Sequence, residues 1–241
     1  MEMKIREVYG LILSEFGLNE FTAKGLEKKL KIDNVALTLH RLCVAGYLVR
    51  VSRGVYRATH PVVLALEWAG FRWREKIVQK IYLPILEHIV VGLIQNFWTR
   101  VISIVLFGSV AAGKARPESD IDLLIVIEDL PENYSERLKV FRRATEGIEE
   151  ITFDLWRKYR IYPLVSPVIL TPEEAEKTQP FYLDMIETSV IILDKNGFMR
   201  KNLEDLRGRL SQLGARRIVL PDGTWFWELK PSIKPGEVID L

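Results

Sequence analysis

The spacing of apolar residues changes along the chain, from helical steps near the N-terminus to continuous apolar runs in the C-terminal half. In residues 3–16 apolar side chains recur every three or four positions, which predicts an amphipathic helix. Residues of the type that cap helices predict the starts of two more: Thr22, and Asp33 or Asn34. Alternating apolar and polar residues over 47–58 then predict a β-hairpin with a tight turn.

Three helices followed by a hairpin resemble a winged helix-turn-helix domain, here covering residues 1–60. In members that bind DNA, the third helix enters the major groove. The resemblance therefore implies nucleic-acid contacts on the third helix and the hairpin: Asn34, Thr38, Arg41, Arg50, Arg53 and Arg57. Residues 1–60 hold ten Lys and Arg against six Asp and Glu, an excess that attracts phosphate only modestly. Such domains also serve in protein interaction and dimerisation, so DNA, RNA and a protein partner all stay open.

The next stretch, residues 61–98, is apolar on more than one side. We expect two helical elements meeting near Pro84, because proline disrupts a helix interior. A stretch of this kind is expected to pack on both neighbouring domains or on a second copy of the chain. It is interpreted as a helical linker to a C-terminal domain of residues 99–241, and a homodimer through 61–98 is a hypothesis.

Two apolar, β-branched runs follow, each typical of a strand buried on both faces: 101–107 and 123–127. Gly108 and Ser109 end the first strand, and Asp120 and Asp122 stand where the second begins. Because the two aspartates lie two residues apart, their side chains leave the strand on the same face. Like charges at that distance repel each other, and a divalent cation between them relieves the repulsion.

The Gly-Ser pair offers a complementary site for an anion. Gly108 has no Cβ, so a phosphate can approach its backbone. A helix that starts at Ser109 would present free N–H groups to that phosphate, and the serine hydroxyl would donate to it. Phosphate oxygens beside a metal held by carboxylates form the arrangement that phosphoryl and nucleotidyl transfer require.

These residues together resemble the signature of the nucleotidyltransferase superfamily that includes DNA polymerase β. The closest pattern is that of its small bacterial and archaeal "minimal" type, GSxxxGxxxxxSDIDLL. Nine residues stand in register with it: Gly108, Ser109, Gly113, Ser119, Asp120, Ile121, Asp122, Leu123 and Leu124. The resemblance extends over about residues 80–241 and implies a nucleoside triphosphate, Mg²⁺ (or Mn²⁺), and transfer of a nucleoside monophosphate to a hydroxyl-bearing or similar acceptor.

The resemblance also assigns roles to residues. It implies that Asp120 and Asp122 are the catalytic metal ligands. It implies nucleotide contacts at a second set of positions: Gly108, Ser109, Lys114 and Ser119.

The remaining pattern predicts a mixed α/β sheet with flanking helices, following the winged helix domain. The expected elements are a helix 134–159 capped by Asp129, a strand 164–170, a capping box 171–174, a strand 189–193, a helix 198–213 and a hairpin 216–229 turning at 221–223. Aromatic residues on the return strand of that hairpin are expected to pack on the sheet or, alternatively, to stack on a base.

One expected catalytic group is missing. Active members of the family usually carry a third acidic residue, which by resemblance belongs near Ser166, and the strand there holds no carboxylate. Asp154 lies on the wrong element, Glu174 has a capping role, and Asp194 ends a different strand. Losing general-base help costs about 10²–10⁴-fold in rate, so binding and turnover have to be judged separately.

Composition restricts the class of protein and the cellular compartment that we expect. The net charge of +2 excludes a protein that coats nucleic acid with its whole surface. The single cysteine, Cys43, excludes an internal disulfide framework and favours a reducing compartment. We expect a cytoplasmic protein with no signal peptide and no membrane partner, because no uncharged run approaches the ~20 residues of a membrane span. Abundant Lys, Arg and Glu favour a thermophilic source.

Whether the protein is an enzyme stays open at this point. The first hypothesis is a Mg²⁺-dependent nucleotidyltransferase weakened by the missing carboxylate. The second is a nucleic-acid-binding regulator whose degraded transferase domain senses nucleotide without turnover. The third is an antitoxin-like partner that modifies or neutralises a toxin.

Overall fold

The structure is a computed structural model of the chain, and it describes residues 4–221 and 225–232. The chain forms two compact units, residues 1–70 and 71–241. The predicted linker 61–98 is therefore shared between the units, with its first helix in unit 1 and the rest in unit 2.

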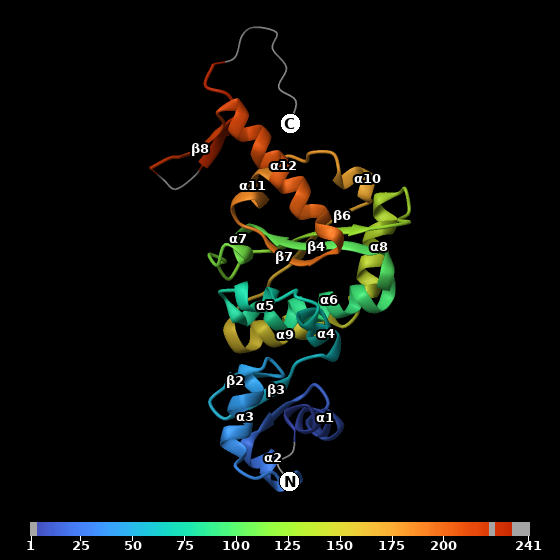
Figure 1. Ribbon diagram of the computed structural model, residues 1–241, viewed down its shortest axis with the longest axis vertical. Helices are drawn as coiled ribbons and strands as arrows, with labels where there is room; N and C mark the ends of the chain where they lie inside the picture. Colours follow the sequence, from blue (N-terminus) through green and yellow to red (C-terminus); the bar gives the residue numbers. More distant parts are fainter. Residues whose placement is uncertain (1–3, 222–224, 233–241) are drawn as a thin grey trace. The chain divides into compact units, whose positions relative to one another are not determined.

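Unit 1 holds three helices, a three-stranded antiparallel sheet of order β1-β3-β2 and a fourth helix (Figure 1). Its elements are α1 (Ile5–Phe16), β1 (Glu20–Thr22), α2 (Ala23–Lys29), α3 (Val35–Val44), β2 (Leu48–Ser52), β3 (Val55–Ala58) and α4 (Pro61–Trp68). The predicted caps are confirmed, since Thr22 accepts from the N–H of Gly25 and Asn34 accepts from that of Leu37. The strand β1 was not predicted. The winged helix assignment itself stays a prediction.

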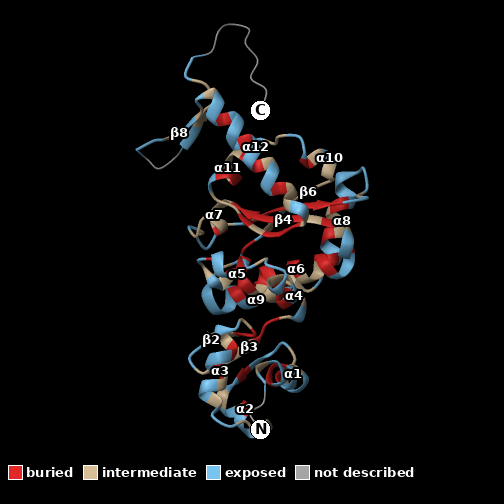
Figure 2. Cartoon of the chain, in the orientation of Figure 1, coloured by how far each residue is buried: buried red, intermediate tan, exposed pale blue. Residues whose placement is uncertain are grey.

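Unit 2 is built on a four-stranded mixed sheet of order β6-β5-β4-β7. Its strands are β4 (Val101–Phe107), β5 (Ile121–Ile127), β6 (Val165–Leu170) and β7 (Val190–Asp194). The pairs β4–β5 and β4–β7 are antiparallel, and β5–β6 is parallel. The two central strands are buried almost throughout, as their unbroken apolar runs predict (Figure 2).

The helices of unit 2 cover both faces of this sheet (Figure 1). In chain order they are α5 (Trp73–Lys76), η1 (Lys80–Tyr82), α6 (Leu83–Phe97), η2 (Trp98–Arg100), α7 (Gly108–Ala111), α8 (Tyr134–Ala144), α9 (Ile148–Tyr159), α10 (Pro172–Ala175), α11 (Tyr182–Glu187), η3 (Lys195–Gly197) and α12 (Phe198–Leu213). The hairpin β8 (Arg216–Val219) and β9 (Trp225–Glu228) follows. Its predicted turn at Asp222-Gly223 lies outside the described residues.

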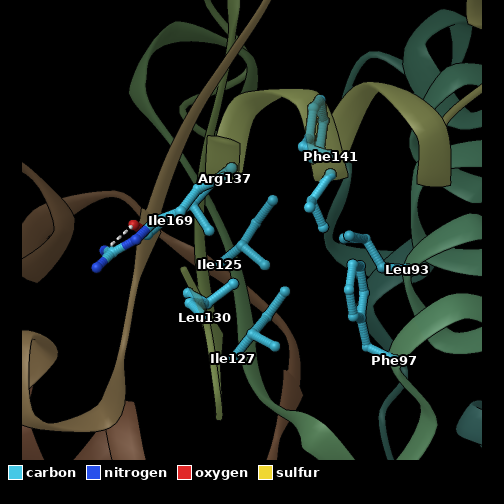
Figure 3. A pocket seen from close by; sticks show the side chains of 9 residues that line it. Leu93, Phe97, Ile125, Ile127, Leu130, Arg137, Phe141 and Ile169 are labelled. Carbon is cyan, nitrogen blue, oxygen red and sulfur yellow. Dashed lines mark hydrogen bonds between the residues drawn. The ribbon is translucent and has the colours of Figure 1, made fainter. Parts of the chain in front are cut away.

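One face of the sheet packs against α6 and α8 (Figure 3). Apolar side chains from α6, β5, β6 and α8 line a pocket there that is too small to hold a water molecule. Arg137 of α8 lies at the edge of this pocket and donates to the carbonyl of Ile169 at 3.2 Å (Figure 3). The opposite face carries Val105, Phe107, Leu124 and Val126, which pack against α11 and α12 in one apolar cluster.

Three predicted elements differ from the structure. The helix expected over 134–159 is broken into α8 and α9 around Gly147, whose φ of +87° a helix cannot accommodate. The cap of α8 is Asn133, which accepts from the N–H of Ser135, and Asp129 does not cap it. Residues 61–97 form four helical pieces, and Pro84 stands in the first turn of α6, where proline is tolerated.

The helical run Lys80–Arg100 is long and apolar enough, by length and composition, to cross a membrane. However, 61% of its most apolar window is buried inside the structure, as in the core helix of a soluble protein. Cytoplasmic location and the lack of a membrane partner stay predictions.

Candidate active site

The site begins where the central strand β4 turns into α7. Gly108, at φ +71°, makes this turn. A Cβ built on Gly108 would lie 2.1 Å from Oδ2 of Asp122, so the carboxylate sits directly against the glycine backbone. Only glycine permits both the backbone angle and the close approach. α7 starts at Gly108, one residue earlier than predicted, and is a single turn, so its dipole is small.

The two aspartates stand across the β4–β5 ladder from this turn. Asp122 is the register partner of Phe107, and Asp120 lies just before β5 begins. Asp120 is exposed and Asp122 is half-buried. Partial burial raises the pKa of Asp122, and the charges of Asp120 and Asp184 raise it further. A divalent cation at this position would relieve that repulsion.

The segment 112–120 joins α7 to β5 and carries two further predicted site residues. Lys114 is exposed, and its backbone N–H donates to the carbonyl of Ser109 at 2.9 Å. The hydroxyl of Ser119 accepts from the N–H of Arg116 at 2.8 Å. Ser119 therefore closes a turn within the segment, in addition to the nucleotide contact that the resemblance implies.

Ser166 occupies the position expected for the third carboxylate. It is the register partner of Asp122 in the parallel β5–β6 pair and is exposed. It also lies at the margin of a cleft of about 630 Å³ between α8, α9 and residues 162–167. The structure thus places Ser166 opposite Asp122 in the ladder, at the position where the resemblance implies a third acidic residue.

The alternative acids considered from the sequence are engaged elsewhere or exposed. Asp194 is buried and accepts from the N–H groups of Met199 and Arg200, which begin α12. Glu174 forms a two-point ion pair with Arg137, at 2.6 and 3.0 Å. Asp154 is exposed on α9. None of these three carboxylates is placed beside Asp122.

A carboxylate that the sequence analysis missed, Asp184 of α11, does act on Asp122. It is half-buried, and its charge raises the pKa of Asp122. Phe181, just before α11, stacks on Phe107 with ring centroids 5.5 Å apart, which places this helix over the end of β4. Burial raises the pKa of Asp184 itself, and the charge of Arg217 opposes that rise. Only the three-dimensional packing of α11 could reveal this residue.

The residues present suit a hard cation in their chemistry. Two carboxylates plus phosphate oxygens and water are a usual set of ligands for Mg²⁺. Across residues 4–221 and 225–232, no three side chains of His, Cys, Asp or Glu come close enough to hold a metal by themselves. A cation here would therefore complete its coordination with substrate and water.

The predicted nucleic-acid contacts all lie in unit 1. Asn34, Arg41, Arg50 and Arg53 are exposed, while Thr38 and Arg57 are half-buried. Asn34 uses its side chain to cap α3, and Thr38 donates to the carbonyl of Asp33 at 3.4 Å. Arg57 stands opposite Glu20 in the β1–β3 ladder. Nothing in this arrangement tests whether the unit binds DNA.

Comparison with known proteins bears on unit 2. Residues 90–178 match the family described as "Nucleotidyltransferase domain". The chain is 30% identical over 131 residues to the "Putative protein adenylyltransferase MJ1305" of Methanocaldococcus jannaschii, covering 54% of this chain and 83% of that protein.

Several solved structures also match, and two of them illustrate the level of similarity. One is described as "Crystal structure of the toxin-antitoxin with AMP-PNP", with 13% identity and a TM-score of 0.29 over 52% of this chain and 90% of that chain. The other is described as "Crystal structure the toxin-antitoxin MntA-HpeT mutant-D39ED41E", with 14% identity and a TM-score of 0.30 over the same shares of both chains. TM-scores this low establish no shared fold, so nothing about this chain follows from those complexes.

The range matched by the family model, residues 90–178, includes Gly108, Asp120 and Asp122. This chain belongs to the nucleotidyltransferase superfamily.

Proposed function

We propose that this protein is a Mg²⁺-dependent nucleotidyltransferase that moves a nucleoside monophosphate from a triphosphate to a hydroxyl group. The relative named as a protein adenylyltransferase favours ATP as the donor and a protein side chain as the acceptor. The observation that carries the proposal is the contact of the Asp122 carboxylate with the backbone of Gly108. It brings a carboxylate of the Asp120–Asp122 pair against the backbone turn at the end of β4, and transfer of a phosphorus group requires a metal-binding acid and a phosphate-binding turn to lie side by side.

We assign a role in binding or catalysis to each residue around the Gly108–Ser109 turn and the aspartate pair. The backbone and hydroxyl of Ser109, with Gly108 beside it, receive the β- and γ-phosphates, and Lys114 offsets their charge. Asp120 and Asp122 hold the cation, which supplies charge neutralisation at the phosphates when it is bound. The acceptor oxygen forms a bond to the α-phosphorus, the bond from that phosphorus to the bridging oxygen breaks, and pyrophosphate leaves.

The acceptor hydroxyl loses its proton in this reaction. Ser166 cannot take that proton as a carboxylate would. Phe181, three residues before Asp184, stacks on Phe107 at the end of β4, and the charge of Asp184 raises the pKa of Asp122, so Asp184 is the candidate base. We assign it that role, which general-base catalysis would make worth about 10²–10⁴ in rate.

The test uses ATP, CTP, GTP and UTP labelled in the α-phosphate, incubated with the protein and with candidate protein acceptors, including the protein itself. The proposal expects labelled product with at least one nucleotide, lost in Asp120→Ala. If Asp120→Ala leaves all labelling unchanged, or no nucleotide gives labelling, the enzyme assignment fails.

A second function is proposed for unit 1, namely binding of duplex DNA. Its support is the exposure of Arg41, Arg50 and Arg53 on α3 and the β2–β3 hairpin. Basic side chains on such elements neutralise phosphates and bind more weakly as salt rises. A gel mobility shift of the whole protein on duplex DNA at low salt tests this, and no retardation would reject it.

A further inference from the structure

The segment 112–120, which carries Lys114 and Asp120, has no regular secondary structure beyond its turns. It is nevertheless tied to the rest of unit 2, and two of the hydrogen bonds that hold it come from one side chain, Gln79. The Gln79 amide nitrogen donates to the carbonyl of Ala115 at 2.9 Å, and the Ala115 N–H donates back to the Gln79 amide oxygen at 3.0 Å. Glutamine fits because its primary amide offers a donor and an acceptor side by side, matching a backbone N–H and C=O.

Neighbours of Gln79 contact the same segment. Val78 packs so closely on Gly113 that a Cβ there would lie 2.9 Å from its side chain. Tyr82 donates its hydroxyl to the carbonyl of Arg116 at 3.5 Å. Three side chains from residues 78–82 therefore hold the first half of the segment, between Gly113 and Arg116.

The backbone that carries Gln79 is anchored by buried neighbouring residues. Trp73 and Ile77 precede it and are completely buried, and Tyr82 after it is 1% exposed. The carbonyl of Gln79 accepts from the N–H of Tyr82 at 3.2 Å, which begins η1. A side chain that projects from such an anchored backbone can hold a segment that lacks regular structure of its own.

The position of Ala115 affects the positions of the two predicted site residues in this segment, Lys114 and Asp120. On one side, the N–H of Lys114 bonds to the carbonyl of Ser109. On the other side, the N–H of Ser119 donates to the carbonyl of Arg116 at 3.0 Å. This hydrogen bond closes a turn between Ala115 and Asp120, so the backbone of the two residues is linked by a short, constrained path. A shift at Ala115 would therefore move Asp120 relative to Asp122 and Gly108.

We propose that Gln79 is a positioning residue that clamps the segment 112–120, so that Asp120 and Lys114 stay aligned with Asp122 and the Gly108–Ser109 turn. This role rests on the proposed nucleotidyl transfer. Gln79 touches neither substrate nor metal and acts only through Ala115.

The test compares Gln79→Met, which keeps the length but removes both hydrogen bonds, with Gln95→Met at an exposed position of α6. Amide hydrogen exchange at Ala115, measured in full-length protein without metal, is expected to accelerate about tenfold or more in Gln79→Met, because two hydrogen bonds are lost. Gln95→Met should exchange like the wild type. Gln79→Leu, which also removes both hydrogen bonds, is the second variant if Gln79→Met does not fold, and the same acceleration at Ala115 is expected of it.

Binding and turnover provide the functional readout. Titration with Mn²⁺ followed by electron paramagnetic resonance should show about threefold or more weaker affinity in Gln79→Met, and kcat should fall about ten- to a hundredfold with KM for ATP nearly unchanged. Unchanged exchange at Ala115 would overturn the clamp. Faster exchange with wild-type Mn²⁺ affinity and kcat would overturn the positioning role. If the wild type neither binds Mn²⁺ nor transfers nucleotide, the proposed function fails and the positioning role with it, while exchange at Ala115 still reports on the clamp.

Discussion

Substitution of Gly108 by alanine perturbs the contact on which the site depends. The added Cβ would lie 2.1 Å from Oδ2 of Asp122 and 3.1 Å from its Cγ. Side-chain carbons essentially never approach other atoms closer than 3.0 Å, so the carboxylate has to move by about 1 Å. The backbone at φ +71° adds strain for any residue other than glycine.

These two effects have different magnitudes and different readouts. A 1 Å displacement of a reacting group costs about 10²-fold in rate, so kcat should fall by about that factor. The backbone strain costs about 1–2 kcal/mol of the free energy of unfolding. In a chain of this size it lowers the melting temperature by about 2–8 °C.

The matched control is Gly197→Ala, because Gly197 has φ +68° and no described atom within 4 Å of an added Cβ. It carries the same backbone strain without the clash. Thermal melts and transfer of label from α-labelled ATP are measured on both variants. We expect similar losses of melting temperature but a loss of activity in Gly108→Ala alone. Activity within about threefold of wild type in Gly108→Ala, or an equal loss in Gly197→Ala, would refute the reasoning.

Three further predictions concern charge. Because the pKa of Asp122 is raised in the folded state, the stability of metal-free protein should fall as pH rises from about 4 through that raised pKa and then level off. Asp122→Asn should reduce this fall, so urea melts in EDTA that show the same pH slope for both proteins would contradict it. Asp184→Asn should lower kcat by about 10²–10⁴-fold while leaving calorimetric binding of Mg²⁺ and ATP in place, and unaltered turnover would remove Asp184 from the mechanism. Replacing Arg50 and Arg53 together by alanine should lower the salt slope of DNA binding by about two, and an unaltered slope would exclude the hairpin from contact with DNA.

Local chemistry made much of the fold predictable. Thr22 and Thr171 cap helices where the sequence places them, because a side-chain oxygen satisfies a nearby N–H whatever the tertiary context. The central strands were predictable because an unbroken apolar run has to be buried on both faces. The break at Gly147 was not, because apolar spacing continues across it and the left-handed backbone leaves no mark on that pattern.

In the candidate site, too, local sequence features were predictable and contacts made by tertiary packing were not. The contact of Asp122 with Gly108 was predictable, since both lie in a motif of two neighbouring strands. Asp184 and Gln79 were not, because each acts on the site or its supporting segment from a distant part of the sequence, through contacts that exist only in the folded unit. A short motif therefore indicated the chemistry, while the groups that support it depend on the whole unit.

Calorimetric titration with ATP and with CTP, with and without Mg²⁺, on the wild type and Asp122→Ala, tests the central claim most directly. The account predicts nucleotide binding that requires Mg²⁺ in the wild type and is lost in Asp122→Ala. Binding that is equal in both proteins, or that ignores Mg²⁺, would contradict the proposal that these carboxylates and the Gly108–Ser109 turn hold a cation and a triphosphate together.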